Sequence, residues 1–372
     1  ATPDLPLRLE SEILEYGRIT RPIALAIKAR VLVTAASPLF NGNTDYASVV
    51  DNRGIALFNQ TYDVQKWQRA AAAADTAINV ALAASHKLVT EYRTKSSISE
   101  NMKRECVLRS TFSERNSTEV IWGATDFPFS QTYQRMCVPL MIQVTSSNPV
   151  SQFYAATLKM AELFYTKNGV PINEDPNYEY QNRYKLRTAV TSESDFVRSG
   201  EQTAILHFDR EARFYASIAF DRGTYFMDPT YYYVQVRAGE LATKRNQGEF
   251  SATGYFVKKL INPNSALNTN TMLAYYEYPF PIIRLADLYL LRTEALNEVK
   301  NAPDAEVYEY IDKVRERAGL EGVVDSWQKY SSKPDKPKTK EGMREIIKQE
   351  RLIELAFEGQ RFWDLRRWKD AE

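Results

Sequence analysis

The chain has 372 residues with 48 basic and 47 acidic side chains, which leaves a formal net charge of +1 at pH 7. A near-neutral chain lacks the basic field that favours nucleic acid, and its charge gives no sign of attraction to anionic lipid. The two cysteines, Cys106 and Cys137, are too few for a disulfide-built scaffold, and they either pair with each other or stay as buried thiols.

Two helices are predicted near the start of the chain. Thr20 and Pro22 suit the first turn of one helix, and Pro38 ends it. Residues 39–62 form a long loop, a length that is uncommon and often functional. Asp63 can cap the second helix, whose alanine-rich face would let another helix approach closely. Further helices are predicted over residues 101–112 and 152–165.

The middle of the chain, residues 118–280, is expected to be irregular and rich in loops. Residues 119–124 are typical of a short strand. In the segment from Phe214 to Asp221, one set of alternate residues alternates with the other, which also predicts a strand with two different faces. The first set is Phe214, Ala216, Ile218 and Phe220, and the second is Tyr215, Ser217, Ala219 and Asp221.

A helix pair is predicted after this middle part. Leu285 to Ala318 spans 34 residues, with Asp304 placed to cap the second helix and Gly319 to end it. This length equals the tetratricopeptide period. Two such helices cannot bury both apolar faces alone, so they are expected to stack with the first helix pair and the last helix.

The C-terminal segment combines acidic, aromatic and basic residues in a pattern that indicates a structural clamp. Glu350, Glu354 and Glu358 are spaced four apart and form one acidic stripe on a helix that Gly359 ends. Guanidinium groups that follow can bind these carboxylates. The side chains predicted to fold back onto the apolar face of the helix are Phe362, Trp363, Leu365 and Trp368. The clamp is predicted to include Arg361, Trp363, Arg366 and Arg367. We expect Arg361 to be the counter-charge of Glu354 or Glu358.

A ligand site is predicted where aromatic residues gather outside the predicted helices, because flat rings stack on sugar rings while polar groups bind hydroxyls. The densest aromatic cluster is Thr224–Tyr233, where Asp221, Arg222 and Asp228 supply polar groups, and a second one lies between residues 122 and 133. The alternative is that these rings pack half-buried in strands. The candidate residues are Arg222, Tyr225, Phe226, Asp228, Tyr231, Tyr232, Tyr233, Trp122, Phe127, Phe129 and Tyr133. The Asn41–Asn43 corner is a third candidate, with a helix-ending turn as its alternative.

The sequence contains no convincing catalytic, metal or cofactor motif. His86 and His207 are the two histidines, and they are expected to be structural or surface residues. Zinc-ligand spacing, a phosphate-binding loop and a dinucleotide fingerprint are absent from the sequence. We therefore expect a protein that is not an enzyme and that needs neither a metal nor a cofactor.

Several segments resemble the SusD/RagB family, the nutrient-binding outer-membrane lipoproteins of Bacteroidetes. ERLIELAFEGQRFWDLRRWK at 350–369 is similar to the C-terminal signature of that family. Other similar segments occur in the expected order, and together they span nearly the whole chain. They are RPIALAIKARVLVTAASPLFNGN at 21–43, DVQKWQRAAAAADTAI at 63–78, LFYTKNGVPINED at 163–175, REARFYASIAFDR at 210–222, TGYFVKKLINP at 253–263, PFPIIRLADLYLLRTEALNEV at 279–299 and YEYIDKVRERAGL at 308–320.

The resemblance implies a mainly α fold, with tetratricopeptide-like helical hairpins packed against a loop-rich region that has a few short β-strands. Residues 1–372 would form one SusD-like domain, with a helical scaffold from 20–117 and 281–372 and a ligand-side region from 118–280. The family binds oligosaccharides at the cell surface and delivers them to a SusC-like, TonB-dependent transporter barrel. A lipid-anchored protein of the outer membrane is therefore expected.

Three alternatives remain at this stage. The same architecture could bind peptides, or a helical-repeat adaptor could bind only a protein partner through an apolar patch on the helix stack. A glycan-active enzyme would need two facing carboxylates in an aromatic cleft. The family's lipidated cysteine is missing from this sequence, the resemblance begins partway through the family pattern, and it stops soon after RRWK. We therefore expect a fragment or processed form that lacks part of the binding surface.

Overall fold

The computed structural model describes residues 4–11, 14–128, 131–143, 145, 150–243, 249–269 and 272–371. In this part of the chain helices predominate, and they are α1 Arg21–Ala36, α2 Val64–Ala83, α3 Glu100–Ser113, α4 Gln131–Cys137, α5 Leu158–Leu163, α6 Ala212–Ser217, α7 Leu285–Val299, α8 Ala305–Arg317, α9 Val323–Tyr330, α10 Lys340–Glu354 and α11 Gln360–Trp368. The predicted mainly α fold is confirmed.

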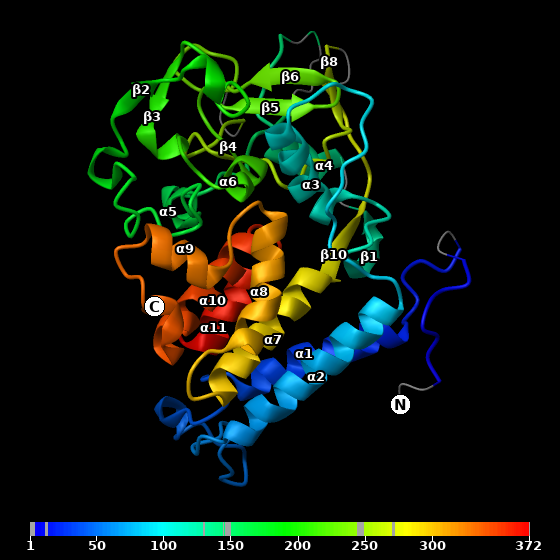
Figure 1. Cartoon of the computed structure of the whole chain (residues 1–372). Helices are drawn as coiled ribbons and strands as arrows, with labels where there is room; N and C mark the ends of the chain where they lie inside the picture. Colours follow the sequence, from blue (N-terminus) through cyan, green and yellow to red (C-terminus); the bar gives the residue numbers. More distant parts are fainter. Residues whose placement is uncertain are drawn as a thin grey trace.

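The long helices form a stack at one end of the molecule (Figure 1). Helices α1 and α2 pack together, α2 packs on α7, and α7 packs on α8 and α10. The predicted starts of these helices are confirmed: α2 begins after Asp63, which accepts a hydrogen bond from Gln65 N, and α8 begins after Asp304, which accepts from Glu306 N. The alanine face of α2 is fully buried, so small side chains do allow close approach.

Short antiparallel strand pairs hold the loop-rich region above the stack (Figure 1). The pairs are β1 Val120–Pro128 with β10 Pro279–Arg284, β2 Leu186–Thr188 with β3 Gln202–Ala204, β4 Ile218–Ala219 with β7 Phe256–Val257, β5 Thr224–Met227 with β6 Thr230–Tyr233, and β8 Ala266–Asn268 with β9 Met272–Ala274. The predicted strand over residues 119–124 is confirmed as part of β1.

Two predictions for the middle of the chain are wrong. The predicted strand from Phe214 to Asp221 is the helix α6 followed by the two-residue strand β4. Residues 213–220 are all buried, so the alternation does not distinguish an inner face from an outer one. The predicted helix over residues 152–165 shrinks to α5, which begins only after its cap Thr157.

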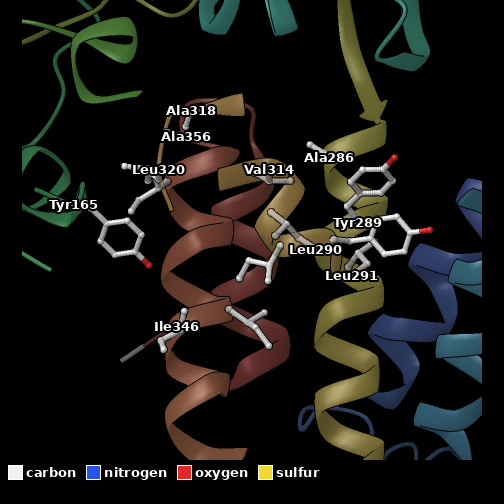
Figure 2. Close-up of a cluster of buried hydrophobic side chains, with 14 of the residues drawn as sticks. Tyr165, Ala286, Tyr289, Leu290, Leu291, Val314, Ala318, Leu320, Ile346 and Ala356 are labelled. Carbon is white, nitrogen blue, oxygen red and sulfur yellow. The ribbon is translucent and has the colours of Figure 1, made fainter. Parts of the chain in front are cut away.

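The main apolar core is shared by the helical part and by α5 and α6 of the loop-rich part. In the helical part, Leu290 and Leu291 of α7 meet Val314 of α8 and Ile346 of α10, and Tyr165 reaches in from the loop-rich part (Figure 2). A second core lies among α3, the β5–β6 hairpin and residues 256–278. Cys106 and Cys137 are separate, buried thiols, so the open question of their pairing is answered: both are free.

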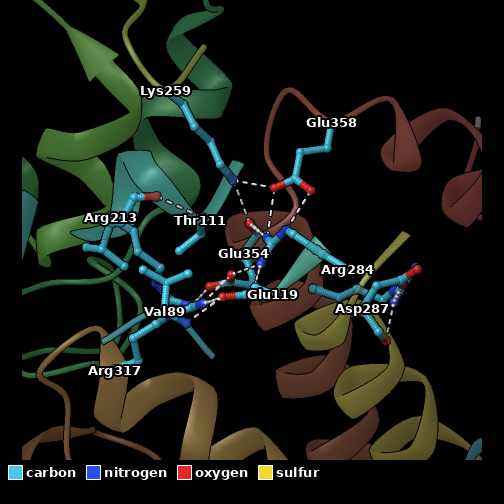
Figure 3. Close-up of polar contacts among 12 residues, drawn as sticks. Val89, Thr111, Glu119, Arg213, Lys259, Arg284, Asp287, Arg317, Glu354 and Glu358 are labelled. Atoms are coloured by element: carbon cyan, nitrogen blue, oxygen red, sulfur yellow. Dashed lines mark hydrogen bonds and ion pairs between the residues drawn. The ribbon is translucent and has the colours of Figure 1, made fainter. Parts of the chain in front are cut away.

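The acidic stripe of the C-terminal segment lies at the junction of the two parts, inside a buried ionic cluster (Figure 3). Its five carboxylates face five cations, so the charges balance. The contacts are Glu350 with Arg213 (2.5 Å) and Arg315 (3.0 Å), Glu354 with Arg213 (3.3 Å), Arg284 (2.7 Å) and Arg317, Glu358 with Lys259 (2.6 Å) and Arg284 (2.8 Å), Glu119 with Arg284 (2.6 Å) and Arg317 (2.7 Å), and Glu211 with Arg213 (2.6 Å). We refer to these ten residues as the junction cluster.

The predicted partners of the stripe are wrong, because its cations come from other elements and not from the residues that follow Gly359. Arg361 forms no ion pair in the described part of the chain, and its Nη1 is buried without a hydrogen-bond partner. Burial therefore lowers the pKa of Arg361. Arg366 lies on the surface, with its guanidinium 3.4 Å from the ring centroid of Phe362.

Arg367 does form buried ion pairs, but within a second cluster. It contacts Glu294 (2.5 Å) and Asp364 (2.8 Å), and Arg351 joins Asp364 (2.8 Å) to Asp287 (2.6 Å). The aromatic residues divide: Trp368 is buried, and its Nε1 donates to Glu294, whereas Trp363 is 66% exposed. Only Trp368 therefore folds back as predicted. Gly359 has φ 81°, which confirms its predicted left-handed conformation. The prediction that it ends the helix is wrong, because α10 already ends at Glu354 and Gly359 directly precedes α11.

Candidate functional site

The densest predicted cluster lies on the β5–β6 hairpin, where strand pairing decides which rings are accessible. Tyr225 pairs with Tyr232, and Phe226 pairs with Tyr231. Tyr225 and Phe226 are fully buried, while Tyr231 is 40% exposed. The ring of Tyr225 lies 5.3 Å from the guanidinium carbon of Arg109, inside the second core. Of the paired aromatics, β6 therefore supplies the surface and β5 the core.

The polar candidates of the hairpin are already engaged by the protein. Arg222 is buried and contacts Glu240 at 2.5 Å, Asp221 at 3.2 Å and Glu201 at 3.3 Å. Asp228 accepts hydrogen bonds from the hydroxyls of Tyr92, Thr94 and Ser96. These groups connect segments of the fold, so the accessible aromatic surface of the hairpin consists of Tyr231 and the half-exposed Tyr232 and Tyr233.

The second candidate, residues 122–133, and the third, the Asn41–Asn43 corner, lie in other parts of the fold. Trp122 is half-buried on β1, and Tyr133 is half-buried on α4, while the side chain of Phe127 and all of Phe129 fall outside the described residues. Asn41 donates from Nδ2 to the carbonyl oxygens of Ala36 (3.1 Å) and Asp63 (3.0 Å), so the Asn41–Asn43 corner joins the end of α1 to the start of α2.

Tyr133 leads to a hollow that has the features of a sugar site. This aromatic hollow has a volume of about 750 Å³. Five aromatic side chains line it together with smaller groups: Tyr133, Phe153, Tyr154, Phe280 and Phe357, with Ala155, Val257, Leu260 and Gly359. Phe153 and Tyr154 are 45% and 36% exposed, so their rings are available to a ligand.

The rings of the aromatic hollow come from four separate segments, each fixed by the fold. Tyr154 N donates to Met136 O at 2.9 Å, which holds the 152–155 segment against α4. Phe280 lies on β10 opposite Ala124 of β1. Phe357 occupies the turn after α10 with φ 65°, a conformation that bulky residues rarely adopt. Strain at a surface-facing aromatic residue is a feature that binding sites use.

The chemistry of the aromatic hollow suits stacking and weak hydrogen bonding. The rings of Tyr133 and Tyr154 are 6.5 Å apart at their centroids, tilted by 32°. Burial, with Cys137 and Tyr133 nearby, raises the pKa of Tyr154, so its hydroxyl stays protonated at neutral pH. The described lining contains no Asp or Glu, so the carboxylate pair that glycoside hydrolysis uses is not found there.

Sequence reasoning found only Tyr133 of this hollow. Phe153, Tyr154, Phe280 and Phe357 lie far from it in the chain, and each looks like an ordinary apolar residue in its own segment. In the described residues there is no group of three or more His, Cys, Asp or Glu side chains able to hold a metal ion. Over the same residues, none of the helices is long and apolar enough to cross a membrane.

Comparison with known proteins identifies the family of the chain. The sequence profile of the SusD family matches residues 104–372. The chain belongs to the SusD family. The SusD-like protein P25 of Formosa agariphila is 42% identical over 87 residues, which make up 23% of this chain and 15% of that protein.

Solved structures of the SusD family extend the similarity to the whole fold. The structure named BT4246 has a TM-score of 0.80 and 28% identity, over 98% of this chain and 63% of that one. A SusD-like carbohydrate binding protein from Bacteroides fragilis NCTC 9343 has a TM-score of 0.53 at 20% identity, over 98% of this chain and 55% of that one, and supports the fold alone. The chain thus spans less than two thirds of these SusD-family structures.

Proposed function

We propose that this SusD-family protein binds oligosaccharides at the bacterial surface through its aromatic hollow and passes them, uncleaved, to a SusC-like, TonB-dependent transporter. The proposal places it on the outer face of the outer membrane, held there by a lipid anchor. The observation that carries the proposal is the convergence of Tyr133, Phe153 and Tyr154 on a hollow with a polar tyrosine rim and no carboxylate in its described lining.

Three lines support carbohydrate as the ligand. Aromatic rings stack on the apolar faces of sugar rings, and protonated tyrosine hydroxyls can bond to sugar hydroxyls. The chain belongs to the SusD family, which is a family of oligosaccharide-binding proteins. The described lining of the hollow also lacks charged residues, which suits contact with the apolar faces and hydroxyl groups of sugar units.

A glycan panel tests the proposal and separates the two aromatic candidates. Binding of neutral polysaccharides is measured by affinity electrophoresis and calorimetry, with reducing-end release as the assay for cleavage. We expect Tyr154→Ala to weaken binding about tenfold or more, equivalent to about 1.4 kcal/mol or more. Tyr231→Ala, at an equally exposed tyrosine of the hairpin, should leave binding unchanged.

Phe362→Ala serves as a matched control for Phe153→Ala, because the two rings are 50% and 45% exposed but only Phe153 lines the hollow. Loss of binding in Tyr231→Ala but not in Tyr154→Ala would move the site to the hairpin. If the wild-type chain binds none of the panel, or releases reducing ends, the proposed function is wrong.

The helical-repeat adaptor is a second candidate, because the stack does carry an apolar hollow of about 760 Å³ between α1 and α11. Val31, Phe40, Leu57 and Trp363 line it, and all four are exposed. Trp363→Ala should reduce co-purification with a β-barrel from outer membranes while leaving glycan binding intact. If Trp363→Ala instead loses glycan binding and still co-purifies with the β-barrel, this assignment is contradicted.

A further inference from the structure

A smaller hollow lies beside β1, between the N-terminal segment and the residues that follow α2. Its volume is about 280 Å³. Residues 7–9, 16–18, 20, 23, 84–86, 115–118 and 120–123 line it. The size is at the lower end of small-molecule sites, which suits a single sugar unit and not an extended chain.

Charge distinguishes this β1 hollow from the aromatic hollow. Arg8, Arg18, Arg115 and His86 line it, and its described lining includes no Asp or Glu. Arg18 is matched by Glu15, which contacts its guanidinium from outside the lining. The other two arginines, Arg8 and Arg115, form no ion pair in the described part of the chain. The hollow therefore has an excess of positive charge.

The position of Arg8 is fixed without using its charge. Its Nη2 donates to the carbonyl oxygen of Ala83 at 3.1 Å and to Ser85 Oγ, both neutral acceptors. His86 is likewise held, because its Nδ1 lies 3.2 Å from the carbonyl oxygen of Thr118. A guanidinium that is held in place by neutral groups keeps its charge available for an incoming anion, which it binds in a fork geometry.

The remaining lining is suited to a sugar. Trp122 supplies an aromatic surface, and Asn116, Ser117 and Thr118 supply amide and hydroxyl groups. The two hollows also share one structural support: Trp122 is on β1, and Phe280 of the aromatic hollow lies on β10 opposite Ala124. Both hollows are therefore positioned by the same strand pair.

We propose that the β1 hollow binds the anionic group of an acidic sugar, a carboxylate or a sulfate ester, so that the preferred ligands are negatively charged oligosaccharides. This inference rests on the proposed function and adds the class of glycan to it. Arg8 and Arg115 bind the anionic group, Trp122 stacks on the ring, and the neutral aromatic hollow binds other sugar units. Trp122, a candidate from the sequence, thus takes a role at a different hollow from the one that contains Tyr133.

The experiment uses two pairs of probes that share a backbone and differ in charge. Hexagalacturonate is compared with its fully methyl-esterified form, and κ-carrageenan oligosaccharides are compared with their desulfated form. We expect at least one anionic probe to bind about tenfold or more tightly than its neutral counterpart, with the preference falling in about 0.5 M NaCl. Which pair shows the preference identifies the group as carboxylate or sulfate.

Paired variants locate the effect. The double variant with Arg8→Gln and Arg115→Gln should abolish the preference for the anionic probe. Its affinity for the neutral probe should be unchanged. Arg53→Gln with Arg69→Gln, which replaces two exposed arginines away from both hollows, should change neither. Thermal melting of each variant checks that it is folded.

The possible failures are distinguishable. Equal binding of charged and neutral probes overturns the anionic class and leaves the proposed function standing. A preference that survives the Arg8 and Arg115 changes overturns the β1 hollow as its source. If none of the four probes binds, the anionic class is again wrong, and the neutral glycan panel described above decides the proposed function separately.

Discussion

Arg284 is the residue whose replacement most directly tests the junction cluster. Its side chain is 1% exposed and contacts Glu119 at 2.6 Å, Glu354 at 2.7 Å and Glu358 at 2.8 Å. Arg284→Met keeps a long apolar stem but leaves five buried carboxylates facing four cations. Burial alone would raise the pKa of Glu354, and Arg317 and Arg284 hold that pKa well below its usual value. Loss of Arg284 removes part of that stabilisation.

The expected loss is about 3–5 kcal/mol, the range for breaking a buried ion pair by removing one partner. For 372 residues unfolding together, the entropy of unfolding is about 0.8 kcal/mol/K, so the loss corresponds to a fall in Tm of about 4–6 °C. Differential scanning calorimetry and urea unfolding followed by circular dichroism measure the change independently. The Tm of Arg284→Lys should fall between those of the wild type and Arg284→Met, because an ammonium group keeps the charge but loses the bidentate geometry of the guanidinium.

Arg361→Met is the matched control. The Arg361 side chain lies in the same C-terminal segment, but burial without a counter-charge lowers its pKa and leaves Nη1 without a partner. Its replacement should change stability by no more than about 0.5 kcal/mol or raise it slightly. If Arg284→Met melts like wild type while Arg361→Met melts early, the assignment of counter-charges to the acidic stripe is wrong.

Three further predictions follow from single buried groups. Tyr225→Phe should keep or slightly raise Tm, because the buried hydroxyl of Tyr225 has no partner; a clear loss would show that it is engaged. Burial lowers the pKa of His207 to about 3, so the unfolded chain binds the extra proton as pH falls below about 6.5. The free energy of unfolding should therefore fall by up to about 1.4 kcal/mol for each pH unit below that value because of His207. His207→Gln should make the free energy of unfolding, measured by urea titration, less dependent on pH between about pH 6 and 5. Burial raises the pKa of the Cys106 thiol to about 12 and that of Cys137 further, so neither should react with a thiol reagent until the protein unfolds; rapid labelling of the native chain would contradict their burial.

The sequence predicts helix starts well, because local chemistry decides them. Asp63 and Asp304 accept hydrogen bonds from the first backbone amides of α2 and α8, and such capping needs only neighbours in the chain. The left-handed residue at Gly359 is similarly local. In contrast, the strand predicted from alternation over residues 214–221 is wrong. Nearly all of these residues are buried, so the segment has no difference between an inner and an outer face, which is what such a prediction depends on.

The candidate site could be predicted only in part, because its residues meet through tertiary contacts. A search for neighbouring aromatics selects the β5–β6 hairpin, where pairing then buries Tyr225 and Phe226. The aromatic hollow combines Tyr133 with rings from residues 153, 154, 280 and 357, and proximity in the sequence does not reveal such a set. The counter-charges of Glu350 were missed for the same reason, since Arg213 and Arg315 are more than 30 residues away.

The position of the junction cluster has a mechanical consequence. Arg213 and Lys259 of the loop-rich part form ion pairs with Glu350 and Glu358 of the helical part, so several pairs of the cluster join the two parts. Separating the two parts would leave several buried charges without their partners at the same time. Bending at the junction cluster is therefore strongly unfavourable. We therefore expect the two parts to move together as one rigid body. The binding surface would then be preformed before a ligand binds.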